Sequence, residues 1–286
     1  MGTGVLGIKY MNISVLILTR NEEINLPDCL ALVAWSDDIV VFDSFSNDRT
    51  VAIAQAAGAR VVQRTFDHYA AQRNAALQDI VYAHPWILML DADERVTPAL
   101  QRELKSTLDH AGSDMTLYHV RRRDMFFGRW LRRSSGYPTW FCRVIRTGQV
   151  WVEREINEQY YTNGKVGFLQ EHLVHYPFNK GIDFWVERHN QYSSMEALLI
   201  AEEIQRPLVW RTLWAHNPVQ RRKALKQLVL RLPAHPFLVF LYLYVLRGGF
   251  LDGFPGFTFC WLRAFYESLI TLKARTLRRQ AQKLPV

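Results

Sequence analysis

The fold class is decided by three apolar stretches: NISVLILT (Asn12–Thr19), DIVVFD (Asp38–Asp43) and WILML (Trp86–Leu90). Each stretch is short, almost continuously hydrophobic and rich in β-branched or bulky side chains, which is typical of a strand that is covered on both faces. Segments with the length and pattern of helices separate the stretches. Because strands that alternate with helices over short spacings form right-handed βαβ units, the sequence predicts an α/β fold with a mainly parallel sheet.

Turn and capping signals place the intervening elements. Pro98 stands where the first turn of a helix tolerates proline, and Gly58 stands where a helix ends. We expect helices at about 22–34, 49–58, 72–81 and 98–109, a short strand at 60–64, short strands and turns from 118 to 176, and further helices at 182–204, 218–232 and 257–279.

Polar residues follow three of the predicted strands, at the point where each strand ends. They are Thr19-Arg20-Asn21-Glu22, Asp43-Ser44 and Asp91-Ala92-Asp93-Glu94. In open α/β sheets, ligands bind outside the carboxyl ends of the strands. Three strand ends that all carry acids or amides therefore predict one binding site at this edge.

The acidic string at the third of these ends is the strongest candidate for a metal site. Asp91 and Asp93 are two residues apart on a tight turn, so both carboxylates can converge on one hard divalent cation, with a pyrophosphate supplying further oxygens. The alternative is structural, because Asp93 or Glu94 can cap the helix that begins near Pro98.

Read in order along the chain, these strings resemble the motifs of the family 2 inverting glycosyltransferases. The strings are TRNE (19–22), DSFSNDRT (43–50), QRN (72–74), LDADE (90–94), INE (156–158), LVH (173–175) and GFLDG (249–253). The resemblance implies a GT-A fold and the use of nucleotide-diphosphate sugars. It is closest in appearance to the lipopolysaccharide-core β-1,4-glucosyltransferase subgroup.

The resemblance also implies roles for single residues. It gives nucleotide-sugar contacts to seven positions: Thr19, Asn21, Glu22, Asp43, Ser44, Arg73 and Asp91. Asp43 would accept a hydrogen bond from the base, which suits the N–H group of uracil and favours a UDP-sugar. Asp93 would bind Mg²⁺ or Mn²⁺ with Asp91 close by, and His175 would complete the metal ligands. The residues alone leave other interpretations open, since Asp43 can be a turn former, Arg73 a surface cation and His175 a structural histidine.

An inverting transfer needs a general base for the acceptor hydroxyl, and Glu158 is the predicted residue. The subgroup usually has Val-His-Glu where this chain has Ile156-Asn157-Glu158, so the glutamate is kept and the histidine is not. A surface salt bridge is the alternative role. Other carboxylates in the same half of the chain are Asp124, Glu153, Glu155 and Glu171.

Arginines crowd the region from 121 to 133. Arg121, Arg129 and Arg143 are candidates for contact with the leaving diphosphate or with an acidic, lipid-linked acceptor. A solvated basic loop is the alternative.

The charge of the chain is concentrated at its end. Residues 204–286 carry 14 basic and 2 acidic side chains, hence +12, whereas the whole chain carries +8. We expect a catalytic domain at 1–206, with a nucleotide-sugar half at about 11–110 and an acceptor half at 111–206, and a helical extension at 207–286. Its apolar run Phe237–Leu246 is roughly 15 Å long as a helix, too short to span a membrane. The extension therefore predicts peripheral association with anionic lipid at the cytoplasmic face of the inner membrane.

The sequence thus predicts a metal-dependent glycosyltransferase that acts on a lipid-linked saccharide in lipopolysaccharide or cell-envelope synthesis. The alternatives are a polyprenyl-phosphate sugar synthase, whose phosphate acceptor needs no base, and an inactive membrane-surface module. Nucleic-acid binding is not expected, because Phe237–Leu246 is too apolar for a solvated phosphate-binding face. Three cysteines without a CxxC pair indicate neither a disulfide scaffold nor a cysteine metal site.

Overall fold

The computed structural model describes residues 11–153, 159–205 and 234–285, together with isolated positions at 214, 217, 221, 224, 228 and 232. The chain forms two compact units: one contains the residues up to Met125 and Tyr137–Asn179, and the other contains Phe126–Gly136 and the residues from Lys180 onward. The division falls between Asn179 and Lys180, so the helix predicted at 182–204 belongs to the second unit. The helix predicted at 218–232 lies outside the described stretches.

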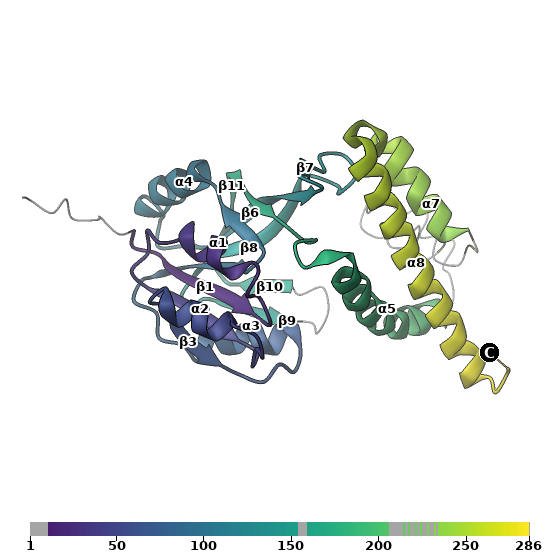
Figure 1. Ribbon diagram of the computed structural model, residues 1–286, viewed down its shortest axis with the longest axis horizontal. Coiled ribbons are helices and arrows are strands. Elements are labelled where there is room, and N and C mark those ends of the chain that lie inside the picture. The colour runs from purple at the N-terminus through teal and green to yellow at the C-terminus, as the bar shows by residue number, and fades with distance from the viewer. Residues whose placement is uncertain are drawn as a thin grey trace, which may run out of the picture. The chain divides into compact units, whose positions relative to one another are not determined.

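The first unit is built on a mixed sheet (Figure 1). In the described part of the chain its strand order is β3–β2–β1–β4–β8–β6–β11–β5. The strands are β1 (Ser14–Thr19), β2 (Ile39–Asp43), β3 (Arg60–Gln63), β4 (Trp86–Asp91), β5 (Glu94–Val96), β6 (Met115–Phe126), β8 (Thr139–Arg146) and β11 (Lys165–His175). Strands β3, β2, β1 and β4 are parallel, whereas β8 is antiparallel to both β4 and β6. The predicted α/β fold with a mainly parallel sheet is confirmed.

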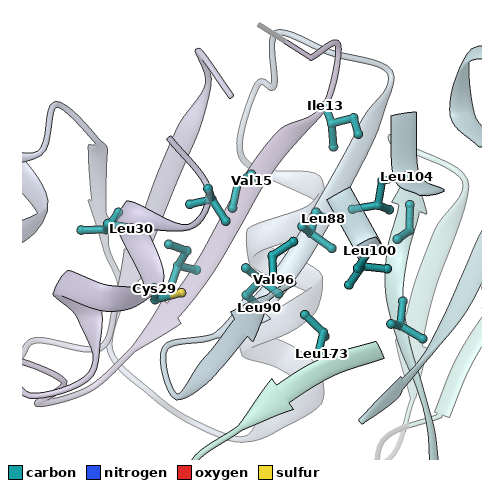
Figure 2. Packing of buried hydrophobic residues seen from close by; sticks show 14 of the residues in the cluster. Ile13, Val15, Cys29, Leu30, Leu88, Leu90, Val96, Leu100, Leu104 and Leu173 are labelled. Carbon is teal, nitrogen blue, oxygen red and sulfur yellow. The ribbon is translucent and has the colours of Figure 1, made fainter. Parts of the chain in front are cut away.

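Helices cover both faces of this sheet because neighbouring residues of a strand point to opposite sides. In β1, Val15 and Ile17 pack with α1 (Leu26–Ala31), α2 (Thr50–Ala56) and α4 (Pro98–Asp109). Leu16 packs instead with α3 (Tyr69–Gln78) and the hairpin of β9 (Val150–Glu153) and β10 (Gln159–Thr162). Figure 2 shows the first of these clusters, in which Leu88 and Leu90 of β4 lie near Leu100 of α4. Each fully buried leucine contributes about 1.5–3 kcal/mol to folding.

The helix predicted at 22–34 is shorter in the structure, at Leu26–Ala31. The residues before it are held by the loop that leads into α2: Asn21 N–H donates to Ser46 Oγ and Glu22 N–H donates to Thr50 Oγ1, both at 2.7 Å. Asn21 has a left-handed φ of 55°, which no helix residue adopts. Because of these long-range bonds, the helix begins at Leu26 and not at Glu22.

The second unit is helical. It contains α5 (Gly181–Gln205), α7 (His235–Leu241), a π-helical turn η2 (Tyr242–Leu246), a 3₁₀ turn η3 (Gly249–Asp252) and α8 (Gly253–Ala281), together with the two-residue strand β7 (Arg129–Trp130). Helix α8 packs against both α5 and α7 (Figure 1). Among the described helices, none alone has the length and apolar composition to cross a bilayer. His235–Leu246 and Gly249–Ala281 meet that criterion only as a pair, and they are bent by 69°.

Candidate active site

The ends of β1 and β2 form the first part of the site. Thr19 and Asp43 are register partners, and Thr19 Oγ1 donates to Asp43 Oδ1 at 2.9 Å. Asp43 is fully buried and also accepts hydrogen bonds from Ser46 and from Gln63 Nε2. A direct bond from Asp43 to a nucleotide base requires the exchange of one of these bonds, so the contact stays a prediction.

The loops that follow these strands hold each other. Asn21 Oδ1 accepts from the Asn47 backbone at 2.9 Å, and the Glu22 carboxylate accepts from Asn25 Nδ2 at 2.9 Å. Ser44 Oγ accepts from Gln72 Nε2 at 3.0 Å, which ties the second loop to α3. The residues predicted for the nucleoside therefore form one connected edge of the sheet, as their positions at neighbouring strand ends imply.

Asp91, at the end of β4, pairs with arginines. Arg143 Nη2 of β8 lies 2.6 Å from Asp91 Oδ2 and 2.8 Å from Glu94 Oε1, while Arg73 Nη2 of α3 lies 3.5 Å from Asp91 Oδ1. Burial raises the pKa of Asp91, but Arg143, Arg73 and Arg122 outweigh it and hold this pKa well below its usual range. The Asp91 side chain is therefore ionised, and its strongest partner is Arg143.

Asp93 forms a second chain of contacts, which Arg122 connects to the first through Glu94 Oε1 at 3.6 Å. Its Oδ2 lies 3.3 Å from His175 Nε2 at the end of β11, and His175 Nδ1 lies 2.7 Å from Asp124 Oδ1 of β6. Arg122 Nε holds the same Asp124 oxygen at 3.1 Å. Burial and Arg122 lower the pKa of His175, but Asp93 and Asp124 outweigh them and raise it to about 9. Backbone pairing fixes the arrangement, because Tyr176 N–H donates to Asp93 O at 2.9 Å.

Asp93 and His175 fit a divalent cation. Two donors on adjacent corners of an octahedron with bonds of about 2.1 Å are separated by about 3 Å, close to the distance between Asp93 Oδ2 and His175 Nε2. A carboxylate on the second ring nitrogen, as Asp124 provides, is the usual support of a ligating histidine. No three acidic, histidine or cysteine side chains converge on a metal site within the described residues. A cation held by Asp93 and His175 would therefore need further ligands, such as diphosphate oxygens or water.

The structure brings some predicted residues together and leaves others apart. Arg143 joins the acidic cluster as a buried partner of Asp91. Arg121 does not join it. Arg122 faces that cluster, so the preceding residue, Arg121, points to the opposite face of the strand, where its guanidinium lies 5.5 Å from the centre of the Trp140 ring. Arg129 belongs to the second unit, and Glu158 lies outside the described residues.

Three residues of the site have other roles than the sequence predicts: Glu94 is expected as a helix cap, Arg122 as part of the arginine cluster at 121–133, and Asp124 as an alternative base. A signal for the last two was present, because Arg122 and Asp124 stand two residues apart and so share a face of one strand.

Comparison with known proteins identifies the family of the chain. Residues 14–184 match the model of Glycosyl transferase family 2. The match covers more than half of the chain, and the chain therefore belongs to this family of transferase enzymes.

Two relatives and one solved structure illustrate the similarity. The chain is 27% identical to the lipopolysaccharide core biosynthesis glycosyltransferase LpsC of Rhizobium meliloti, over 93% of both chains. It is 25% identical to an uncharacterized glycosyltransferase of Rickettsia prowazekii, over 95% of this chain and 89% of the relative. Glucosyl-3-phosphoglycerate synthase from Mycobacterium tuberculosis, solved with Mn²⁺, UDP and glucosyl-3-phosphoglycerate, is 23% identical over 39% of this chain. The match covers only 44% of that chain, with a TM-score of 0.34.

Proposed function

We propose that this protein is a metal-dependent inverting glycosyltransferase of lipopolysaccharide-core or cell-envelope synthesis. It moves a sugar from a nucleotide-diphosphate sugar, with UDP favoured, to a hydroxyl group of a lipid-linked saccharide. Membership of family 2 supports the reaction class. The similarity to LpsC over 93% of both chains supports the type of acceptor.

The observation that carries the proposal is the contact chain of Asp93, His175 and Asp124 beside the arginine-paired Asp91. Asp93 and His175 would hold Mg²⁺ or Mn²⁺, and the bound ion would neutralise the departing diphosphate. Asp124 orients the His175 imidazole by holding Nδ1, so that Nε2 faces Asp93.

Arg73 is the proposed phosphate contact. Its distance to Asp91 is 3.5 Å, whereas the Arg143–Asp91 distance is 2.6 Å. An incoming phosphate would therefore displace Arg73 from Asp91 more easily than Arg143. Arg143 stays with Asp91 and Glu94 and keeps both carboxylates in place. We assign the general base to Glu158, whose carboxylate would take the proton of the acceptor hydroxyl during attack on the anomeric carbon.

The second unit supports a peripheral site of action on the cytoplasmic face of the inner membrane. Basic residues outnumber acidic ones by 14 to 2 after residue 203. Large apolar side chains on α7 and α8 are exposed, among them Phe237 at 60% and Trp261 at 62%. Apolar area together with basic charge is the composition that binds anionic interfaces.

The test is transfer from a panel of nucleotide sugars to two acceptors, a hydroxylated glycolipid and a polyprenyl phosphate, with Mn²⁺ present. We expect transfer to the glycolipid, from a UDP-sugar. Transfer to the polyprenyl phosphate alone would identify a polyprenyl-phosphate sugar synthase, and absence of both transfer and donor hydrolysis would identify an inactive binding module.

Asp93→Asn should lower the rate of transfer by orders of magnitude while leaving the fold intact, because it removes the charged metal ligand. Asp114→Asn is the matched control, since Asp114 is exposed and pairs with the exposed Lys165 at 2.7 Å. Near-normal transfer by Asp93→Asn, or transfer that survives exhaustive chelation, would contradict the metal assignment.

A further inference from the structure

The turn between α7 and α8 in the second unit has a fixed shape. Gly248 and Gly253 have positive φ values of 74° and 69°. A Cβ on Gly256 would lie 2.3 Å from the carbonyl oxygen of Gly249, so the backbone segments touch with no room for a side chain. The turn therefore has a defined, closely packed backbone conformation.

The loop Phe126–Gly136 is fastened to this turn by one carboxylate. Asp252 Oδ2 accepts three hydrogen bonds of 2.8 Å, from Arg133 N–H, Ser134 N–H and Ser134 Oγ. Asp252 is only 4% exposed. Its charge is thus directed at backbone and hydroxyl groups, while the arginine side chains of the loop stay in solvent.

A pocket of about 410 Å³ lies where the loop and the turn meet, and its lining consists of Arg129, Trp130, Arg132, Arg133, Leu251 and Asp252. The three arginines are exposed, and none of them forms an ion pair with another residue that the structure describes. Arg132 lies over the Trp130 ring at 5.6 Å. Guanidinium groups donate in a planar fork that matches phosphate oxygens, so the pocket has the chemistry of a phosphate site.

Apolar side chains stand exposed around the same pocket. Phe127 is 64% exposed, Leu251 57% and Phe254 69%, and the rings of Phe127 and Phe254 lie 5.9 Å apart. A soluble phosphate needs no apolar rim. A phospholipid presents its phosphate beside acyl chains, which is the combination that an arginine pocket with exposed aromatic rings complements.

We propose that this pocket binds the phosphate headgroup of an anionic membrane lipid, with the aromatic rim inserted at the boundary between headgroups and acyl chains. The turn therefore lies at headgroup depth, and α7 and α8 lie along the interface. The turn is not the apex of a hairpin that dips to the middle of the bilayer, because three arginines would then lie in hydrocarbon without ionic partners. The inference rests on the proposed membrane association of the second unit.

The first experiment compares two triple variants with equal charge loss on the full chain. One removes the pocket arginines (Arg129→Gln, Arg132→Gln, Arg133→Gln), and the other removes three exposed arginines near the end of α8 (Arg275→Gln, Arg278→Gln, Arg279→Gln). Binding is measured by sedimentation with vesicles of phosphatidylcholine alone and with added phosphatidylglycerol. We expect the pocket variant to lose about tenfold more affinity for the anionic vesicles than the control variant.

Equal losses of vesicle affinity in the two variants would refute the pocket as a lipid site but would not contradict membrane association. Absence of binding to any vesicle would overturn both, whereas donor hydrolysis, measured without lipid, tests the proposed chemistry separately. Binding of millimolar inorganic phosphate, without binding of vesicles, would identify a site for a soluble phosphate and would contradict the proposal. Self-association through the apolar rim would give a dimer in sedimentation that Phe254→Ser dissolves, and this result would also contradict the proposal.

The second experiment measures depth. A nitroxide attached to Phe254→Cys reports its position through relaxation by water-soluble and membrane-soluble agents, and the three native cysteines are buried. We expect the label at the headgroup boundary in phosphatidylglycerol vesicles. A label at the bilayer midplane would show a re-entrant hairpin and would refute the proposed depth.

Discussion

At the scale of single residues, His175 is the proposed metal ligand whose protonation would control the binding of a cation. Its imidazole lies between Asp93 and Asp124, and its pKa is raised to about 9, so the metal-free site holds a proton at neutral pH. A cation that binds Nε2 must displace this proton. The same two carboxylates that would support the metal therefore make its binding dependent on pH.

We predict that one proton is released for each Mn²⁺ bound, and that the apparent Kd falls by up to about tenfold per pH unit between pH 6 and 8. Calorimetry in buffers of different ionisation enthalpy counts the protons. His175→Gln should bind more weakly and release none. Binding to wild type without proton release would show that His175 is not a ligand.

Glu158 is the second residue whose role can be tested directly. Glu158→Gln keeps the shape of the side chain and removes the base, so transfer should fall by about 10²–10⁴ while donor and metal affinity persist. Glu153→Gln is the control, because Glu153 is exposed and bonded to Trp151 Nε1 at 3.1 Å. Asp124→Asn should differ from both by weakening Mn²⁺ binding. If Glu158→Gln is active and Glu155→Gln is inactive, the base has been assigned to the wrong residue.

At the scale of elements, local patterns predict the first half of the sheet well. The strand predicted at Trp86–Leu90 extends one residue further in the structure, and the helix predicted at 98–109 is observed as Pro98–Asp109. Side-chain pattern and capping residues determine these elements locally. The predictions are less accurate where contacts between distant residues determine the structure. Examples are the helix predicted at 22–34 and the later strands β6 and β11, which are 12 and 11 residues long.

The same distinction applies to the site. Asp91, Asp93 and His175 are recognisable from their strings, but the pairing of Arg143 with Asp91 depends on the insertion of β8 between β4 and β6. Antiparallel insertion of a distant strand leaves no local signal. A sequence motif therefore identifies the acids, and only the fold identifies their partners.

Asp38 joins three elements and provides a test of stability. It accepts from Ser14 Oγ at 2.5 Å, Arg60 Nη2 at 2.7 Å and Ala83 N–H at 2.8 Å. Burial raises its pKa, but these bonds outweigh burial and lower it below 3.8. We predict that Asp38→Asn lowers the free energy of unfolding by about 1–3 kcal/mol at pH 7.

The folded-state pKa of Asp38 lies below the unfolded value, so its contribution is complete above pH 3.8 and disappears as pH falls through the folded value. Urea unfolding at pH 7, 5 and 3 should show a constant difference between wild type and Asp38→Asn at the two higher values and a smaller one at pH 3. Asp37→Asn, at an exposed neighbour that pairs with His84 Nε2 at 2.6 Å, should change stability by about 1 kcal/mol or less. A difference that grows toward acid would contradict this account.

At the scale of the whole molecule, the two units carry different chemistry. The first unit gathers the acids and their arginine and histidine partners at the carboxyl edge of its sheet. The second carries exposed aromatic side chains and most of the excess positive charge. This division would suit the proposed substrates, which are a soluble donor and an acceptor held in a membrane.

The proposed reaction depends most on a divalent cation at Asp93 and His175 that would bind the diphosphate of a UDP-sugar. The most direct measurement is calorimetric titration of UDP into the full chain, with Mn²⁺ and with a chelator, for wild type, Asp93→Asn and the control Asp114→Asn. We expect Mn²⁺ to tighten UDP binding to wild type and to Asp114→Asn by at least about tenfold and to have no effect on Asp93→Asn. UDP binding that is equally tight with the chelator, or equally enhanced by Mn²⁺ in Asp93→Asn, would contradict the metal assignment.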